Sequence, residues 1–239
     1  MGEGIFKQKN GLLAVDVVGS CGVLTPEQLA GLARLAEKAG AIAFKLTSRQ
    51  TLVALLPEGR AEGFIEGLAT LGLRVSPYGN VVRAVKACPG NEDFCPRALG
   101  DALGLGMALQ ERYLGREVPK DFKIAVAGCP RGCVDPYCAD FGVIAAGKDV
   151  FDVAVGGMGG SSRPRHGVVI ARRIGREKVF ALLEHVLARF GELAQPREKL
   201  GRAIERLGVE PFLPPAPTLA PEEEDGSLAE FARFLKEHD

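Results

Sequence analysis

The chain has 239 residues, of which 46% are hydrophobic and 25% are charged, and its 30 basic side chains balance its 30 acidic ones. This composition is typical of a globular protein with a substantial core. With no net positive charge and no tryptophan, nucleic acid and acidic membranes are poor candidate partners. The N-terminus shows no apolar signal segment and no run of about 18 apolar residues occurs, so we expect a cytoplasmic protein that does not enter a membrane.

The first third of the chain predicts a small layer of helices and strands. Thr25 is suited to an N-cap, because Pro26 can occupy the first helical position and Gln28 can close a capping box. The expected elements are a strand at 11–18, a helix that Gly40 ends, strands near 42–47 and 51–56, and a helix at about 58–71. This β-α-β-β-α order indicates an α+β, ferredoxin-like domain over residues 1–78, with both helices on one face of an antiparallel sheet.

Residues 79–210 form the second expected α+β domain. A loop-like segment, residues 76–100, carries two cysteines, and Pro96 within it is expected to open a helix that runs to about Leu114. A loop rich in glycine and arginine covers residues 156–167. The remaining expected elements are strands at 122–127, 141–146, 150–155 and 167–171, and helices near 176–190 and 197–207.

The last segment, residues 211–239, differs in composition from the rest of the chain. Five prolines between Pro211 and Pro221 predict a stiff, extended linker. Ser227 and Glu230 then offer a capping box for a short helix with one apolar stripe. A helix of this length is not stable alone, so it would pack on its own domain, a second protomer or a redox partner.

Four of the six cysteines form two pairs, and these pairs carry the strongest chemical signal. Cys88 and Cys95 have C-x6-C spacing, and Cys129 and Cys133 have C-x3-C spacing. Glycine and proline around both pairs allow tight turns that present N–H groups to sulfur, and a helix opening at Pro96 would direct its positive end at the same place. Spacing alone leaves three alternatives open: an iron–sulfur cluster, a structural zinc site, or buried free thiols.

The two remaining cysteines have weaker signals. Cys21 follows the first expected strand and is interpreted as a small packing residue. Cys138 follows Cys133 by five residues, and it either lines a cavity near the paired cysteines or is structural, the default for a free cysteine.

Over about residues 11–208 the chain resembles the siroheme sulfite and nitrite reductases. Thr47-Ser48-Arg49-Gln50 is similar to the family's T-x-R-Q segment, and the strand ending in Gly128 is followed by Cys-Pro-Arg-Gly-Cys, similar to the family's G-C-P-x-x-C. The other matching segments are Val82–Gly90, Asp140–Ile144 and the glycine-rich stretch 156–160. The resemblance implies a [4Fe–4S] cluster held by Cys88, Cys95, Cys129 and Cys133, with Cys133 bridging the cluster to a siroheme iron.

The resemblance also implies roles for basic residues. Arg49, Arg83 and Lys123 match cations that the family places over the open face of the siroheme iron, where they would bind an oxyanion and assist its reduction. Without the motif context, the two arginines would be surface ion pairs and Lys123 a solvated strand-edge lysine. Residues expected to contact the carboxylates of siroheme are Lys86, Arg131, Gly157, Gly159, Gly160, Arg163, Arg165 and His166, although a mobile loop is the alternative for 156–167.

Three features depart from the family pattern. The first cysteine pair is C-x6-C where the family usually shows C-x5-C. Asp121 stands where the larger reductases often carry an active-site lysine, and Lys120, offset by one residue on a strand, would point to the other face. The larger reductases contain two copies of this module and this chain has one, so a homodimer or a different subunit would supply the second.

The sequence therefore predicts an enzyme that reduces sulfite to sulfide, or nitrite to ammonia, in a six-electron reaction. No nicotinamide or flavin site is visible in the sequence, because the glycines at 156–160 lack the Rossmann spacing, so electrons would come from a separate donor protein. A non-catalytic siroheme and [4Fe–4S] subunit is the alternative that Asp121 motivates. A zinc-stapled interaction protein is the third.

Overall fold

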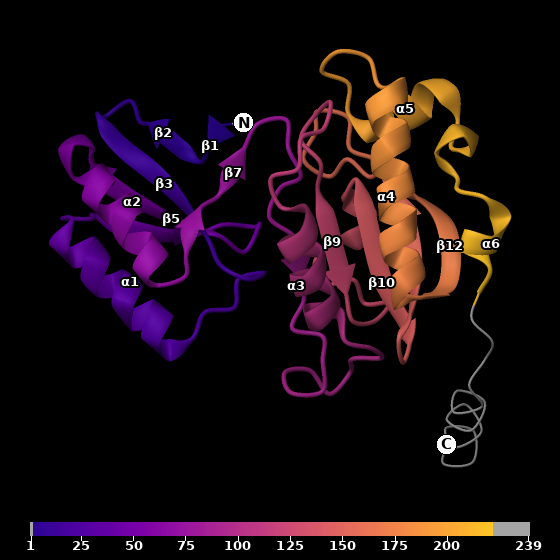
Figure 1. Ribbon diagram of the computed structural model, residues 1–239, viewed down its shortest axis with the longest axis horizontal. Helices are drawn as coiled ribbons and strands as arrows, with labels where there is room; N and C mark the ends of the chain where they lie inside the picture. The colour runs from indigo at the N-terminus through magenta and orange to yellow at the C-terminus, as the bar shows by residue number, and fades with distance from the viewer. Residues whose placement is uncertain (1, 222–239) are drawn as a thin grey trace.

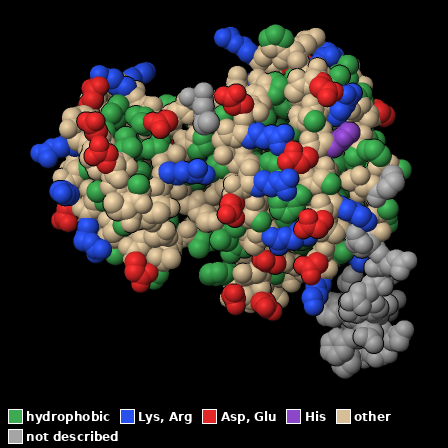
Figure 2. Space-filling view, viewed as in Figure 1, with side chains coloured by type: hydrophobic (Ala, Val, Ile, Leu, Met, Phe, Trp, Pro, Cys, Tyr) green, Lys and Arg blue, Asp and Glu red, His purple; other side chains and the backbone are tan. Residues whose placement is uncertain are grey.

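The computed structural model describes residues 2–221. They fold into two α+β units that lie side by side (Figure 1). Within the described residues, each helix is too short or too polar to cross a bilayer. On the face drawn in Figure 2, acidic and basic side chains are mixed and do not separate into fields of one sign, in keeping with the zero net charge.

The N-terminal unit is an antiparallel sheet with two helices on one face. Its strand order is β2-β3-β5-β4, and β6 also pairs with β3. The strands are β2 (Ile5–Lys7), β3 (Leu12–Val18), β4 (Ala43–Leu46), β5 (Leu52–Pro57) and β6 (Arg74–Val75), and the helices are α1 (Pro26–Lys38), η1 (Glu58–Arg60) and α2 (Ala61–Thr70). A separate short pair joins β1 (Gly2–Glu3) to β7 (Pro77–Tyr78). The predicted ferredoxin-like layer is confirmed.

Local sequence explains why these elements form where they do. The predicted capping box is present, with Gln28 N donating to Thr25 Oγ1 at 3.1 Å and Thr25 N donating to Gln28 Oε1 at 3.0 Å. Alternate apolar residues of β3 and β5 point to the helices and form one core with α1 and α2. That core contains Val15, Val17, Leu32, Ala54, Leu56, Phe64 and Leu68.

The C-terminal unit is a mixed sheet of order β12-β11-β10-β9-β8. The neighbours β8, β9 and β10 are parallel, whereas β10, β11 and β12 are antiparallel. The strands are β8 (Lys86–Ala87), β9 (Ile124–Ala127), β10 (Phe141–Gly147), β11 (Val150–Val155) and β12 (Val168–Gly175). The helices are α3 (Ala102–Tyr113), η2 (Pro136–Cys138), α4 (Arg176–Leu193), α5 (Leu200–Leu207), η3 (Glu210–Phe212) and α6 (Ala216–Leu219). This α+β architecture agrees with the predicted fold class.

Two expected elements are wrong in position. The helix expected at Pro96 begins at Ala102, because Asp101 caps it by accepting from Gly104 N at 2.8 Å, while Ala98 N and Leu99 N bond to Cys95 O and Gly128 O in a turn. The expected positive helix end therefore does not directly follow Cys95.

The segment expected to be an extended linker is also packed at its start. Phe212 is fully buried, and Arg189 Nε of α4 donates to Pro211 O at 2.9 Å. Apolar burial thus outweighs the extended preference of the prolines. The helix expected after Ser227 lies outside the described residues, and the boundaries 1–78, 79–210 and 211–239 remain a proposal for the domains.

Candidate active site

Two of the paired cysteines leave the sheet at the same edge. Cys88 follows β8 and Cys129 lies two residues beyond β9, and these strands are parallel neighbours, so their carboxyl ends meet. The pairing of β8 with β9 continues to the first cysteine, since Cys88 N donates to Val126 O at 3.0 Å. Gly128 N donates to Cys88 Sγ at 3.0 Å, the kind of N–H donor that stabilises a cluster thiolate.

The other two cysteines come from turns beside this edge. Cys95 N donates to Asn91 O in the loop after β8, and Cys133 is exposed in the turn before η2. Burial raises the pKa of Cys88, and the nearby thiols of Cys133, Cys129 and Cys95 raise it further. The charges of the other three thiols therefore reach Cys88, and none of the four is in a disulfide. Within the described residues the four sulfurs do not form a closed metal site.

Glycine is required where the two cysteine loops touch. A Cβ added at Gly90 would lie 2.7 Å from Gly128 Cα and 2.7 Å from Cys88 Sγ, and one added at Gly128 would lie 2.7 Å from Gly90 Cα. Backbone contact this close leaves no room for side chains. The two loops therefore form a tight cradle around Cys88.

A polar cavity of about 330 Å³ lies next to the cysteine loops, and three cationic side chains line it. Arg49 comes from the N-terminal unit, whereas Lys86 and Lys123 come from the C-terminal unit. The other lining residues are Ser48, Asp135, Cys138, Ala139, Gly159 and Gly160. The cavity thus faces both units, and its charge favours an anion.

Arg49 is held in place by the turn between β4 and β5. Thr47 Oγ1 accepts from Arg49 N at 3.1 Å, and Arg49 Nε donates to Ala84 O at 3.2 Å across the unit boundary. Burial, together with the charge of Arg83, lowers the pKa of Arg49 to about 10, which still leaves the guanidinium charged at neutral pH. The next residue, Gln50, has a φ of 59° and forms a pair of hydrogen bonds with Ala87.

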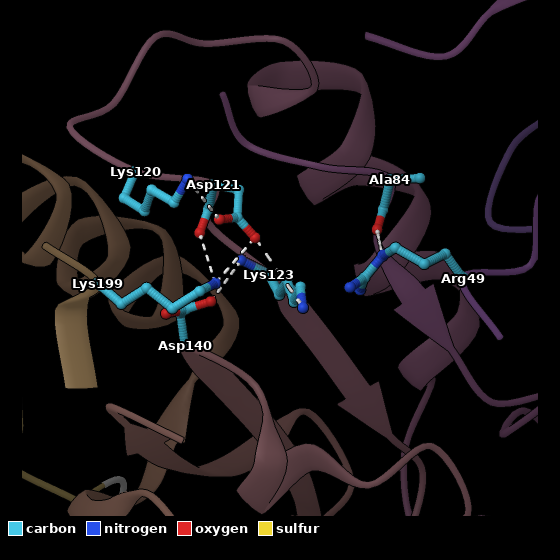
Figure 3. A network of polar contacts seen from close by, with 7 residues as sticks. All are labelled: Arg49, Ala84, Lys120, Asp121, Lys123, Asp140 and Lys199. Carbon is cyan, nitrogen blue, oxygen red and sulfur yellow. Dashed lines mark hydrogen bonds and ion pairs between the residues drawn. The ribbon is translucent and has the colours of Figure 1, made fainter. Parts of the chain in front are cut away.

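Lys123 enters the cavity just before β9, opposite Arg49 (Figure 3). Its backbone N donates to Asp140 Oδ2 at 2.9 Å, which fixes the strand end. Burial, followed by the charges of Lys199 and Arg49, lowers the pKa of Lys123 below its ordinary value. Burial raises the pKa of Asp140 to about 6, although Lys199 opposes the shift.

Arg83 lies close enough to Arg49 to affect its pKa but is not among the residues lining the cavity. Its guanidinium carbon stacks 4.1 Å from the centre of the Tyr78 ring. Its buried Nε has no hydrogen-bond partner within residues 2–221. Such an unsatisfied cationic donor is a candidate to bind an anion.

The residues expected around siroheme differ in how firmly they are held. Gly157 and Gly159 pack against η2, where an added Cβ would lie 2.3 Å from Tyr137 O and 2.7 Å from Cys138 Cβ. Lys86 pairs with Asp135 at 3.4 Å. Arg165 donates to Gly201 O at 3.3 Å, whereas Arg131, Arg163 and His166 are exposed.

Sequence reasoning missed two members of this site. Lys199, the residue before α5, reaches Asp121 Oδ2 at 2.8 Å, and Asp140 is a buried carboxyl beside Lys123. Lys199 lies in none of the matched segments, and Asp140 opens the segment Asp140–Ile144, to which the sequence assigned no role at the cavity. Lys199 and Asp121 are 78 positions apart, so local patterning carries no signal for their contact.

An α+β fold with four free cysteines around one sheet edge and a cationic cavity beside them points to a metal-dependent oxidoreductase that acts on an anion. The family described as nitrite and sulphite reductase 4Fe–4S domain matches residues 78–216, and the nitrite/sulfite reductase ferredoxin-like half domain matches residues 6–71. Since the first match spans more than half of the chain, the chain belongs to the nitrite and sulphite reductase family.

Individual relatives agree with this assignment. The chain is 30% identical over 192 residues to the assimilatory-type sulfite reductase of Nitratidesulfovibrio vulgaris, covering 80% of this chain and 85% of that protein. It is 30% identical over 215 residues to a nitrite reductase [NAD(P)H] of Emericella nidulans, covering 85% of this chain but 18% of the fungal protein. The solved structure of dissimilatory sulfite reductase I matches with a TM-score of 0.75 at 16% identity over 89% of this chain and 72% of that one, which shows the shared fold.

The cofactors of the chain are siroheme and a [4Fe–4S] cluster, and its residues fit both groups. Four free thiols and a peptide N–H directed at Cys88 Sγ suit the cluster. The cations of the cavity and the glycine-rich loop beside it suit a tetrapyrrole that carries carboxylates. The zinc-stapled alternative is wrong, since the matched domain is a 4Fe–4S domain.

Proposed function

We propose that the chain catalyses the six-electron reduction of sulfite to sulfide, with nitrite as the competing substrate. The observation that supports this most directly is the cationic cavity beside the four thiols. The reaction consumes six electrons and seven protons per hydrogen sulfite and yields hydrogen sulfide and three waters. Sulfite is preferred because the relative that this chain covers along most of its length is named a sulfite reductase.

The cavity residues bind and orient the oxyanion in this proposal. Arg49 and Lys123 face it from opposite units, and Arg83 backs Arg49. Fixed cations stabilise negative charge on the anion's oxygens without needing to reorganise. Lys123 also suits proton donation to a leaving oxygen, because its lowered pKa makes the ammonium a stronger acid.

We further propose that Cys88, Cys95, Cys129 and Cys133 ligate the cluster and that Cys133 also ligates the siroheme iron. The exposure of Cys133, in the turn that leads to the cavity residues Asp135 and Cys138, favours it for the shared position. When bound, the coupled cofactors supply the electrons that the reaction consumes. The carboxylates of siroheme would be held by Lys86, Arg131, Arg163, Arg165 and His166 and by the backbone of Gly157, Gly159 and Gly160.

The proposal extends to the electron donor, the cellular location and the oligomeric state of the enzyme. A separate donor protein would deliver electrons, because neither cofactor collects hydride from a nicotinamide. The six free cysteines fit the reducing conditions of the cytoplasm. The chain would act as a homodimer, because the matched N-terminal family is described as a half domain and β4 leaves one edge of its sheet unpaired within the described residues.

An anaerobic measurement tests the function directly. Protein purified without oxygen should show siroheme absorption, together with five iron atoms per chain, four from the cluster and one from siroheme, and four acid-labile sulfides. With reduced methyl viologen as electron donor it should consume sulfite, and nitrite less efficiently. Cofactor-replete protein that consumes neither anion would contradict the proposal and favour the non-catalytic subunit that Asp121 motivates.

A further inference from the structure

Asp121 opposes the purpose of the cavity, because its negative charge lies beside the cavity lysine Lys123, close to an anion site. Its carboxylate has three lysines around it (Figure 3). Lys199 Nζ lies 2.8 Å from Asp121 Oδ2, whereas Lys123 Nζ lies 4.0 Å from the same oxygen and Lys120 Nζ lies 3.9 Å from Oδ1. Only the contact with Lys199 has hydrogen-bond length.

Lys199 is well placed to keep that contact. It directly precedes α5, and its carbonyl accepts from Arg202 N and Ala203 N, which fixes its backbone. Its ammonium also reaches Asp121 O at 3.5 Å, so it meets both the backbone and the side chain of the same residue. The pair is mostly buried, with side-chain exposures of 22% for Lys199 and 18% for Asp121, so solvent weakens it little.

Within the described residues, the Lys199–Asp121 contact leaves the Lys123 ammonium without a close carboxylate partner. At 4.0 Å from Asp121 its ammonium forms no hydrogen bond with that carboxylate, and in Figure 3 it lies between Asp121 and Arg49. Its N–H donors therefore remain available to the cavity. If Lys199 were absent, Asp121 would be a largely buried carboxylate without its close partner, and Lys123 and Lys120 would be the cations left to neutralise it.

We propose that Lys199 is a positioning residue that retains the Asp121 carboxylate, so that the Lys123 ammonium stays free to bind the oxyanion. This inference rests on the proposed function only for the identity of the anion. The charged groups facing Lys123 are Asp121 and Lys120 from its own segment, Asp140 before β10, Lys199 before α5, and Arg49 between β4 and β5.

The first test measures Lys123 itself in the holoenzyme, independently of turnover. The rate at which an amine-directed acylating reagent labels Lys123 is followed by mass spectrometry between pH 7 and pH 10, because only the neutral amine reacts. Lys199→Met should slow the labelling of Lys123, since it removes a repulsive charge and lets Asp121 pair with Lys123. Asp121→Asn should speed it, and the double variant should return it towards the wild-type rate. Lys7→Met, which breaks the Lys7–Glu58 pair of the N-terminal unit, is the control with one lysine removed.

The second test is kinetic. Lys199→Met should raise KM for sulfite by about tenfold, the effect of losing one hydrogen bond to a charged group, with a smaller change in kcat. Adding Asp121→Asn should restore KM, which a purely structural role for Lys199 would not produce. Lys123 labelling that is unchanged in both Lys199→Met and Asp121→Asn overturns the proposal, and Asp121→Asn alone decides if Lys199→Met does not fold. Absence of sulfite and nitrite reduction would reject the proposed function, while the labelling would still test the placement of Asp121.

Discussion

At the scale of single residues, a buried carboxyl whose ionisation is costly lies beside the cavity lysine Lys123. Asp140 is 2% exposed, and burial raises its pKa from 3.8 to about 6. Between these values the folded protein still holds a proton that the unfolded chain has released. Stability therefore falls as the pH rises through this window, by at most about 3 kcal/mol.

We predict that Asp140→Asn removes this pH dependence. Asparagine keeps an oxygen that can accept from Lys123 N but does not ionise. Relative to the variant, the wild-type protein should lose stability as the pH rises from about 4 to about 6 and change little above that. Thermal unfolding of the holoprotein across this range measures the difference. Parallel curves for the two proteins would show that Asp140 does not titrate there.

How much of the site can be predicted from the sequence depends on how far apart along the chain the interacting residues lie. The cysteine pairs and Arg49 sit in short motifs, so the sequence alone singled them out. Lys199 and Asp140 were missed because their chemistry arises from contacts with Asp121 and Lys123 that only the folded chain makes. The assigned roles of all these residues remain predictions.

At the scale of elements, the side chain of Gln50 joins the two units next to the cavity, beside the contact that Arg49 makes with Ala84 O. Gln50, in the turn between β4 and β5, donates from Nε2 to Ala87 O at 2.6 Å and accepts from Ala87 N at 2.8 Å. This pair occupies the free edge of β8 as a further strand would. It fixes the turn that carries Arg49 against the strand that leads to Cys88.

We predict that Gln50→Met loosens this junction. Methionine has a similar length but leaves the buried N–H of Ala87 without its partner, which costs about 1–3 kcal/mol. Urea unfolding should show the loss, and KM for sulfite should rise because Arg49 is less well held. Gln8→Met is a suitable control, since Gln8 bonds to Phe6 O within the N-terminal unit. Equal stability of the two variants would argue against a joining role for Gln50.

Element types were predicted better than element ends. The capping box at Thr25 marked the start of α1 correctly because both partners lie within one turn. Pro96 predicted a helix start, yet the chain turns there and Leu99 N donates to Gly128 O. The helix begins only after its N-cap, Asp101. A tertiary hydrogen bond thus outweighed a local preference.

At the scale of the whole molecule, the sheet edge at β4 is exposed in the part of the chain that the structure describes. All four residues of β4 are exposed, and Ile42, Phe44 and Leu46, at alternate positions, are 63%, 39% and 69% exposed. Within the described residues β4 pairs with β5 alone. Exposed apolar edge strands promote association, and natural monomers protect them. The sequence showed an apolar strand here but not that it lies at an edge.

We predict that a second copy covers β4 in the homodimer. An antiparallel pair of identical strands has two-fold symmetry, so β4 can pair with itself and close the assembly. In a register centred on Phe44, Lys45 lies opposite Ala43 of the partner, which avoids contact between like charges. Phe44→Glu places two carboxylates at the centre of this interface and should convert a dimer into a monomer in light scattering after size exclusion. Leu207→Glu, on an exposed position of α5, should leave the mass unchanged. A wild-type monomer, or a Phe44→Glu protein of dimer mass, would show that β4 does not hold the assembly together.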